Sequence, residues 1–428
     1  MKKWLMALLV GMVMVVLAAC SSDEETSESG SGNDETNGSE ENNTEEEQVT
    51  IKIWDYLAPD SSSAREQEAL IEQYEEENPN VTFERTYMPF ADLKTKLLQG
   101  LGAGDLPDIV VIDNPDHQSF AQAGVFADIT EKVEKWGEAG QYFDGPMSSA
   151  MLDGKYYGIP NNSNALAIYY NKKMFEEAGI TELPTTWEEF RSVAETLTEG
   201  DVKGFAMSGV KSEEGTFQFL PYLWQAGADI DSFGSDAAKD AMSFVHGMVE
   251  DGLVSSNMIN WDQSDVMVQF QTEKAAMMEN GPWQIPILKE DSPELDWGVF
   301  LMPAGEAGTA SILGGENWAI TANSEVEDEA WEFIKWTQQP DVLGPMHELG
   351  GRLPSRADVA NDEQYNWAQD EHVKVFMEQL ETAKPRAYGT NYPEISTHIQ
   401  EAIQRVMTGE DVDTVMESTA EEINPLLP

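Results

Sequence analysis

Strand and helix patterns alternate along residues 49–113, and this alternation restricts the possible folds more than any other feature of the sequence. In the strand patterns, apolar residues alternate with polar ones or form a short continuous run, whereas in the helix patterns they recur every three or four residues. The strand patterns cover residues 49–53, 81–87 and 108–112, and the helix patterns cover residues 63–77 and 90–101. This order is typical of an α/β fold with a parallel sheet.

The same alternation returns later in the chain. Three more strand patterns occur at residues 165–170, 274–278 and 298–302, and the C-terminal helix patterns cover residues 373–383, 394–407 and 412–423. Capping boxes, which begin helices, are found at Ser63–Glu66, Thr186–Glu189 and Ser324–Glu327. About 380 residues follow the N-terminal region, which is enough for two domains. We therefore predict two α/β halves.

The N-terminus has the pattern of a bacterial lipoprotein signal. Lys2 and Lys3 precede an apolar run that ends in Leu17-Ala18-Ala19-Cys20. The run is too short and has the wrong flanks for a permanent membrane span. Cys20 is the only cysteine, and it stands where a lipobox places a diacylglycerol thioether. We expect residues 1–19 to be removed and Cys20 to anchor the chain to the outer face of a Gram-positive cell membrane; an ordinary signal with an unmodified cysteine is the alternative.

Residues 20–48 are expected to form a disordered acidic tether. After Cys20 this segment contains no aromatic or aliphatic residue, so nothing offsets the entropy of ordering it. The chain has 79 acidic and 25 basic residues. Without the 11 acids of the tether and the two lysines of the signal, 68 acidic and 23 basic residues remain. This charge excludes nucleic acid as a partner, because phosphate binding needs clustered Lys and Arg.

Catalytic and cofactor motifs are absent from the sequence. It contains no Gly-x-Ser-x-Gly, no His-Glu-x-x-His and no Walker-type phosphate loop. The five histidines lack the spacing of metal ligands, and the calcium-like start at residues 229–234 places Phe233 at a ligand position. Carboxylates are so abundant that glycosidase-like pairs arise by chance. We expect a protein without catalysis, metal or cofactor.

Aromatic and small polar residues gather where the predicted strands end. They lie in Trp54-Asp55, Asp113-Asn114, residues 158–164, Gly281-Pro282-Trp283 and residues 314–318. In an open α/β sheet, ligands bind at the carboxyl ends of strands, so these segments can line one cleft. Carbohydrates suit such a lining, because their C–H faces stack on Trp and Tyr while Asp, Asn and Glu bind their hydroxyl groups. The alternative is that each Trp is a core residue.

Several sequence blocks carry a resemblance to a known family. These blocks are GDLPDI at 104–109, GKYYGIP at 154–160, YYNKKMF at 169–175, AGI at 178–180, LPTTW at 183–187, AM and GPW within 276–283, and GRLPSR at 351–356. In this order and behind a lipobox, they resemble the extracellular solute-binding proteins of carbohydrate ABC importers, the maltose-binding-protein-like family. The resemblance covers nearly the whole chain after Gln48.

This resemblance implies an α/β, two-lobe periplasmic-binding-protein fold of type II, the Venus-flytrap arrangement. Each lobe would be a mostly parallel sheet flanked by helices, and the chain would cross the hinge three times. Carried onto this sequence, lobe I holds residues 49–160 and 317–370, and lobe II holds residues 161–316 and 371–428. The family also implies a monomer that captures a mono- or oligosaccharide between the lobes and delivers it to the transmembrane subunits of an ABC permease.

The resemblance also orders the candidate ligand-binding residues. Trp283 matches a family position that stacks on sugar, and Trp54, Asp55 and Asp113 match positions that contact ligand in the first lobe. The further candidates lie beside Asp113, at the hinge, in the second lobe or near the last helices: Asn114, Asn161, Asn164, Phe217, Gln218, Glu316, Asn317, Trp318, Tyr388 and Tyr392.

Three other functions remain open at this point. A secreted lipoprotein that hydrolyses or cleaves polysaccharide would share the lipid anchor and the aromatic cleft. A receptor for a sensor kinase would use the same binding fold. A binding protein for glycerol-phosphate or another anionic solute would use Arg352, Arg356 and Arg386, which are otherwise surface ion pairs.

Overall fold

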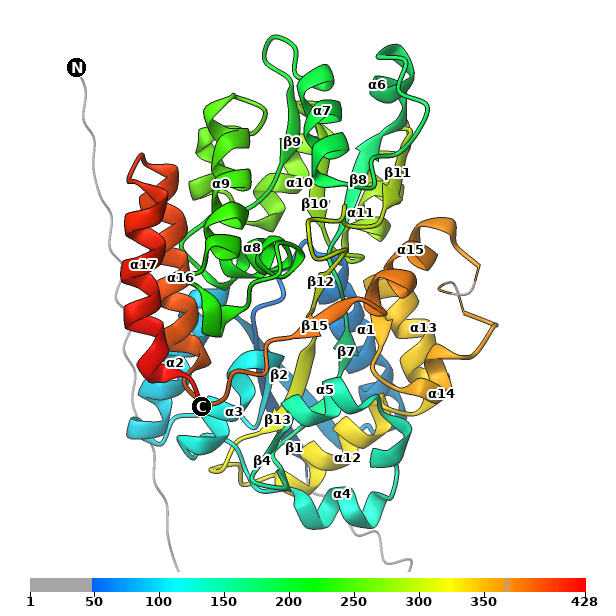
Figure 1. The fold of residues 1–428 in the computed structure, drawn as a ribbon. Coiled ribbons are helices and arrows are strands. Elements are labelled where there is room, and N and C mark those ends of the chain that lie inside the picture. The colour runs from blue at the N-terminus through cyan, green and yellow to red at the C-terminus, as the bar shows by residue number, and fades with distance from the viewer. Residues whose placement is uncertain (1–47, 366, 368) are drawn as a thin grey trace, which may run out of the picture. The chain divides into compact units, whose positions relative to one another are not determined.

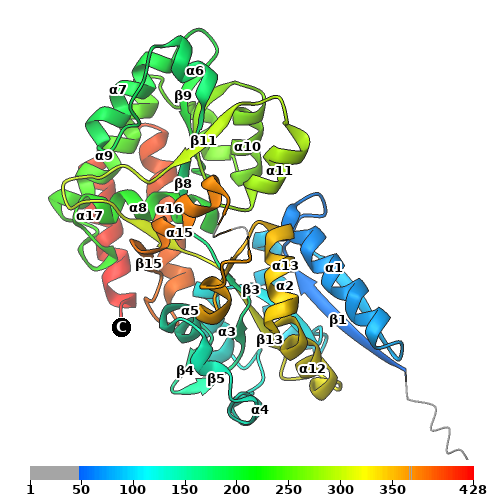
Figure 2. The same cartoon turned by 90° about the vertical axis from the view of Figure 1, so that its right-hand side faces the viewer.

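The computed structural model describes residues 48–365, 367 and 369–428. The described residues form one compact unit, and two main sheets organise it (Figure 1). In Figure 1 the sheet that contains β8 to β11 lies above the sheet that contains β1 to β3, and the view turned by 90° shows the same separation (Figure 2). The predicted signal at residues 1–19, Cys20 and the tether up to residue 47 lie outside the described residues.

The first sheet has the strand order β2-β1-β3-β13-β6. β1 (Val49–Asp55) pairs in parallel with β2 (Val81–Tyr87) and with β3 (Ile109–Asp113). β13 (Glu316–Ile320) runs antiparallel to β3 and to β6 (Ile159–Pro160). Every residue of β3 is buried, as the apolar run at residues 108–112 predicts. The three strands expected within residues 49–113 are therefore confirmed.

The second sheet has the strand order β11-β8-β10-β9. β8 (Ala167–Asn171) runs antiparallel to β10 (Ala275–Asn280) and to β11 (Trp297–Phe300), whereas β9 (Lys203–Ala206) is parallel to β10. The expectation that each sheet is mostly parallel therefore needs correction. β8 and β13 enter their sheets directly from the segments that join the two halves, without the helical crossover that a parallel neighbour requires.

Helices from distant parts of the sequence cover the first sheet. They are α1 (Ser62–Glu77), α2 (Phe90–Ala103), α3 (Asn114–Gln122), α4 (Thr130–Trp136), α5 (Asp144–Ser149), α12 (Glu327–Thr337), α13 (Pro340–Gly350) and α14 (Ala357–Ala360). A small hairpin of β4 (Met151–Leu152) and β5 (Lys155–Tyr156) follows α5. One core includes Ile53, Trp318 and Phe333, and a second includes Leu93 and Val110. The apolar strands are thus buried on both faces.

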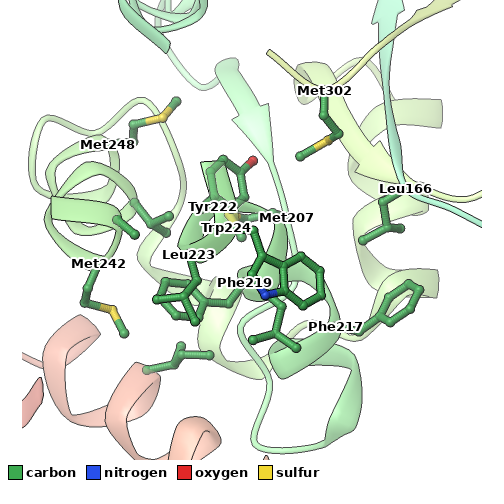
Figure 3. Close-up of a cluster of buried hydrophobic side chains, with 14 of the residues drawn as sticks. Leu166, Met207, Phe217, Phe219, Tyr222, Leu223, Trp224, Met242, Met248 and Met302 are labelled. Atoms are coloured by element: carbon green, nitrogen blue, oxygen red, sulfur yellow. The ribbon is translucent and has the colours of Figure 1, made fainter. Parts of the chain in front are cut away.

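The second sheet is covered by α6 (Lys172–Glu177), α7 (Trp187–Leu197), α8 (Glu213–Gln225), α9 (Asp236–Glu250), α10 (Gln263–Gln271), α11 (Gln284–Asp291), α15 (Glu371–Leu380), α16 (Tyr392–Met407) and α17 (Val412–Ile423). Every residue of α8 except Glu214 is buried, so α8 is an interior helix. Its Phe219, Tyr222 and Trp224 lie in a cluster with Met242 and Met302 (Figure 3).

Short strand pairs lie where the chain passes between the two sheets. β7 (Asn162–Ser163) pairs antiparallel with β14 (Leu353–Pro354), and β12 (Ser311–Leu313) pairs in parallel with β15 (Ala383–Pro385). An isolated bridge joins Asn164 to Gly314. Segments that are distant in sequence therefore lie side by side where the two halves join.

One of the three predicted capping boxes is confirmed. The Thr186 side chain accepts from the Glu189 backbone N–H, and Glu189 caps Thr186 in return. The other two predictions are wrong, because α1 has Ser61 as its N-cap and α12 begins after Val326 without a side-chain cap. Tertiary contacts engage the groups that would have formed these boxes: Glu66 is buried and paired with Arg352, and Ser324 Oγ donates to Asp108 at 2.8 Å.

Candidate functional site

Arg386, in the loop after β15, joins the two halves. Its Nη1 donates to Asp113 Oδ2 at 3.0 Å and to Glu213 Oε1 at 2.7 Å. Its Nη2 donates to Asp113 Oδ1 at 2.9 Å and to Asn114 Oδ1 at 3.1 Å. Asp113 ends β3 and Asn114 begins α3, whereas Glu213 begins α8 in the second half. All four residues are buried, so the predicted ligand residues Asp113 and Asn114 are engaged by an internal cation.

Two more predicted residues, Phe217 and Tyr392, belong to this cluster. The guanidinium carbon of Arg386 lies 4.8 Å from the centre of the Phe217 ring. Tyr392 donates its hydroxyl to Glu213 Oε1 at 2.5 Å, and Ser396 also donates to Glu213. The sequence therefore predicted neighbours correctly, but their polar groups bind one another.

The Arg386 cluster contains more carboxylates than cations. Lys94 of α2 pairs with Asp116 of α3 at 2.5 Å, so three carboxylates, Asp113, Asp116 and Glu213, face two cations. Burial raises the pKa of Asp113 to about 7, although the positive charge of Arg386 opposes this rise. Because Asp116 and Glu213 add further negative charge, the cluster favours uptake of a proton near neutral pH.

A second, partly buried cluster forms around Glu316 at the start of β13. Glu316 accepts hydrogen bonds from the Tyr56 hydroxyl at 2.9 Å and from Asn162 Nδ2 at 2.5 Å. Arg352 lies 3.3 Å from Glu316 and 3.0 Å from Glu66. Tyr56 directly follows β1, and Arg352 lies between α13 and β14. Glu316 thus holds groups from several elements, and its place at the hinge stays a prediction.

The predicted hinge residues Asn161 and Asn164 lie in the segment between β6 and β8. The Asn161 backbone carbonyl faces His347 Nε2 at 3.1 Å, and His347 Nδ1 lies 2.9 Å from Glu66. The side-chain oxygens of Asn161 and Asn164 are buried and have no hydrogen-bond partner among the residues that the structure describes. These two side chains therefore keep acceptors that a ligand can use.

Trp283 lies where the two halves meet. It directly precedes α11 and packs against the core of the second half, and its indole is half-buried. Its backbone carbonyl accepts a hydrogen bond at 2.9 Å from Ser62 Oγ of α1, in the first half. The position fits the predicted role, because part of the indole remains accessible beside the other half.

Trp54 and Asp55 end β1 but differ in how deeply their side chains are buried. Trp54 is half-buried beside an apolar cluster of the first half. Asp55 is fully buried, and both of its carboxylate oxygens accept from Arg85, at 2.7 and 2.9 Å. Asp55 is therefore a structural partner of Arg85, and its contact with a ligand stays a prediction.

Three other predicted residues have structural roles. Gln218 accepts from the Ser208 N–H and donates to the Glu279 carbonyl. Asn317 bonds with Ser149 at 3.0 Å, and Trp318 is fully buried in the first-half core. Protein groups thus engage the amides of Gln218 and Asn317, and the Trp318 ring packs in the core. Ligand contacts of these three residues stay predictions.

The predicted Tyr388 and the unpredicted Tyr87 remain partly accessible. Tyr388 is half-buried and donates its hydroxyl to Asp229. Tyr87, at the end of β2, is 39% exposed. Burial first, and then the nearby Asp60 and Asp262, raise the pKa of Tyr87.

Sequence reasoning missed Tyr56, Asn162 and the pairing of Arg386. Tyr56 directly follows Trp54-Asp55, so extending that strand-end segment by one residue would have included it. Asn162 lies between two predicted residues and carries the same amide group as both. Arg386 lies in a loop without periodicity, and no sequence pattern indicates that it pairs with carboxylates more than 170 residues away.

Two cavities lie apart from these clusters. One of about 900 Å³ lies between α4 and α12 and includes Trp136, Trp331 and Lys335 in its lining. Another of about 380 Å³ is lined by Trp224, Asp229 and other residues of the second half.

Within residues 48–365, 367 and 369–428, no helix is long and apolar enough to cross a membrane. The same residues contain no group of His, Cys, Asp and Glu side chains that could hold a metal ion.

Comparisons with known proteins agree with one another. Residues 69–375 match the family described as bacterial extracellular solute-binding protein. A putative binding protein of Brucella abortus is 27% identical over 364 residues, which cover 83% of this chain and 88% of that protein. The multiple sugar-binding protein of Streptococcus mutans is 26% identical over 302 residues, covering 66% of this chain and 70% of that protein. One solved structure is that of an ABC transporter solute-binding protein of Thermotoga lettingae bound with α-D-tagatose. It is 26% identical to this chain, the match covers 89% of this chain and 100% of that chain, and the TM-score is 0.82.

Proposed function

Because this chain belongs to the bacterial extracellular solute-binding protein family, we propose that it is the substrate-binding protein of a carbohydrate ABC importer. The two-lobe periplasmic-binding-protein fold expected from the sequence is confirmed. One relative is named for binding multiple sugars, and one structural neighbour holds tagatose. In this function the chain captures a mono- or oligosaccharide between its halves and delivers it unaltered to a membrane permease.

The observation that supports a neutral ligand is that the three candidate arginines are already paired with carboxylates. Each of them contacts two carboxylates: Arg352 contacts Glu66 and Glu316, Arg356 contacts Glu138 and Asp358, and Arg386 contacts Asp113 and Glu213. An anionic solute would have to displace these carboxylates from buried positions, which is costly. A neutral carbohydrate needs no such displacement, so it is favoured over glycerol-phosphate.

The remaining assignments follow from the same function. Lobe I comprises residues 49–160 and 317–370, and lobe II comprises residues 161–316 and 371–428. The short pairings near β7, β12 and β15 lie between the lobes and act as the hinge. The chain is a monomer, and a lipid on Cys20 holds it at the outer face of a Gram-positive membrane. The bound sugar stabilises the closed form because it contacts both lobes.

A fluorescence titration of residues 48–428 tests the function. Maltose, maltotriose, lactose, tagatose and several dozen other neutral sugars are added while tryptophan emission is recorded, and the sugar is recovered afterwards. We expect at least one sugar to bind with micromolar or tighter affinity and to be recovered intact. The absence of any response contradicts a sugar-binding function, and shortened products identify a hydrolase or lyase instead.

Trp283→Ala tests which indole contacts the sugar. Loss of a stacked ring worth about 1.5 kcal/mol weakens binding roughly tenfold. The matched control is Trp136→Ala, which removes another half-buried indole from the cavity between α4 and α12. We expect the control to bind as the wild type does. Equal affinity of the wild type and Trp283→Ala would remove Trp283 from the site.

A further inference from the structure

Residues 161–164 and 314–316 run side by side between the two halves; we call them the hinge pairing. The Asn161 N–H donates to the Glu316 carbonyl at 2.7 Å, and Asn164 and Gly314 exchange two backbone hydrogen bonds at 3.0 Å. Asn164 is therefore opposite Gly314, and Asn161 is opposite Glu316, as the register of Pro160 with Asn317 also requires. Asn162 reaches Glu316 through its side chain. Because side chains alternate along an extended chain, Asn162 and Asn164 share one face of the pairing, about 7 Å apart.

Both asparagines on this face have side-chain oxygens without a donor. Asn162 is 2% exposed and Asn164 is 8% exposed. Neither Oδ1 atom accepts a hydrogen bond from any side chain or backbone group of the described residues. Buried acceptors are almost always satisfied in proteins, and an unsatisfied one carries a desolvation penalty. Two such acceptors on one face therefore indicate that a donor is supplied from outside the chain.

The orientation of the Asn162 amide is fixed by its neighbours. Its Nδ2 donates to Glu316 Oε2 at 2.5 Å. Glu316 also accepts from the Tyr56 hydroxyl and pairs with Arg352. A carboxylate paired with an arginine accepts hydrogen bonds and does not donate them. The amide nitrogen of Asn162 must therefore face Glu316, and the oxygen must be the atom left without a partner.

Gly314 keeps the space beside Asn164 free of a side chain. A Cβ atom at position 314 would lie 2.1 Å from Asn164 Oδ1 and 2.9 Å from two carbons of the Phe217 ring. Phe217 in turn stacks under Arg386. The face that carries the two free oxygens is thus continuous with an aromatic ring of the second half, and Tyr56 borders it through Glu316 on the side of the first half.

We propose that Asn162 is a ligand-binding residue whose Oδ1, together with that of Asn164, accepts hydrogen bonds from two hydroxyl groups of the bound carbohydrate. This inference rests on the proposed function and deepens it. Both groups are acceptors beside a carboxylate, so they select hydroxyl donors and disfavour phosphate or carboxylate ligands. The sugar removes the penalty of two unsatisfied acceptors in the closed form, so it binds that form better than the open one.

Asn162→Leu tests this assignment, because leucine has a similar shape and no acceptor. The probe is whichever of maltose, maltotriose, lactose and tagatose binds residues 48–428 of the wild type. We expect the variant to bind at least tenfold more weakly. Leucine also removes the hydrogen bond that Asn162 donates to Glu316, so it lowers stability as well as affinity. The monodeoxy sugars described next therefore separate a ligand contact from a structural role, because a structural role weakens the binding of every form of the sugar by the same factor.

Ser163→Ala is the matched control. Ser163 is the next residue along β7 and lies on the opposite face, where its hydroxyl bonds with Ser355 at 3.0 Å. We expect this variant to bind the sugar within twofold of the wild type. Monodeoxy forms of the sugar give a second readout. We expect the form that lacks the hydroxyl group paired with Asn162 to bind the wild type tenfold more weakly than the intact sugar does. We expect Asn162→Ala to bind the intact sugar and this monodeoxy form equally weakly. Unchanged affinity of both Asn162 variants overturns this inference alone, whereas a wild type that binds none of the sugars overturns the proposed function and this inference with it.

Discussion

Arg386 carries a positive charge into a buried position between two carboxylates from opposite halves. Removing it would leave Asp113 and Glu213 without their arginine partner, a change that costs about 3–5 kcal/mol in buried pairs. We therefore expect Asp113 to affect ligand affinity through the position of Arg386. A direct contact with sugar would require the carboxylate to leave a bidentate partner.

Glu214 gives a pH-dependent prediction at the residue scale. Glu214 is half-buried; loss of hydration first, and then the negative charge of Asp262, raise its pKa from 4.5 to about 8. The folded protein therefore binds this proton more tightly than the unfolded chain does, so the free energy of unfolding falls as the pH rises from about 4.5 to about 8. Urea unfolding of the wild type and Glu214→Gln at pH 5, 6.5 and 8 measures the effect. We expect the advantage of the variant to grow with pH, by at most about 1.4 kcal/mol per unit.

Glu188→Gln is the control for this pH series. Glu188 lies in the first turn of α7 and is exposed, so its substitution should leave the pH dependence of the wild type unchanged. If Glu214→Gln followed the same pH curve as Glu188→Gln, the raised pKa of Glu214 would be refuted.

At the residue scale, the sequence predicts which residues are neighbours better than what they bind. Asp113, Asn114, Phe217 and Tyr392 do lie in one cluster, because strand ends and helix starts meet there. Their partner Arg386 was not predictable, because its pairing depends on how a loop after β15 is placed by the tertiary fold. The same holds for Asp55, whose carboxylate is taken by Arg85 on the neighbouring strand.

The hinge pairing depends at the element scale on a backbone that only glycine tolerates. Gly315 has φ of +142°, and a Cβ there would lie 2.1 Å from the Asn162 carbonyl oxygen. Gly315→Ala therefore adds both backbone strain and a clash with the neighbouring strand. We expect it to lower the free energy of unfolding by about 1–3 kcal/mol, measured by urea denaturation.

Gly102→Ala should change the free energy of unfolding in the opposite direction. Gly102 lies in α2, and a Cβ there would meet nothing within 4 Å. Alanine in a helix is favoured over glycine by up to about 1 kcal/mol, so this control is expected to be neutral or stabilising. A Gly315→Ala protein as stable as Gly102→Ala would show that the hinge pairing does not require glycine at 315.

Element types were predictable, but the details of their ends were not. The Thr186–Glu189 box forms because both side chains are exposed and free for local bonds. Glu66 and Ser324 have the same local spacing, yet long-range partners take their polar groups. A capping signal therefore predicts a helix start reliably only where the residues remain at the surface.

At the scale of the whole molecule, the distribution of charge matters more than its sum. The chain carries a net charge of −54, yet the interior between the halves contains arginines that are each paired with two carboxylates. A high net charge of one sign favours solubility, while the arginines of the interior are already paired and are not free to bind an anionic ligand. This arrangement suits an uncharged solute.

The order of α/β segments was enough to predict two halves, and the family resemblance was enough to predict their fold. Strand direction was not predictable from the same patterns. β13 is separated from β3 by about 200 residues and joins the first sheet only after the chain has built the second. Local periodicity identifies such a strand but contains no information about its partner or direction.

The central claim is that two halves close around a neutral sugar. Small-angle X-ray scattering of residues 48–428 tests it most directly, with and without a saturating amount of the sugar identified by fluorescence. We predict that the sugar decreases the radius of gyration and that this decrease is lost in Trp283→Ala at the same sugar concentration. An unchanged radius of gyration with every sugar that binds would contradict the account.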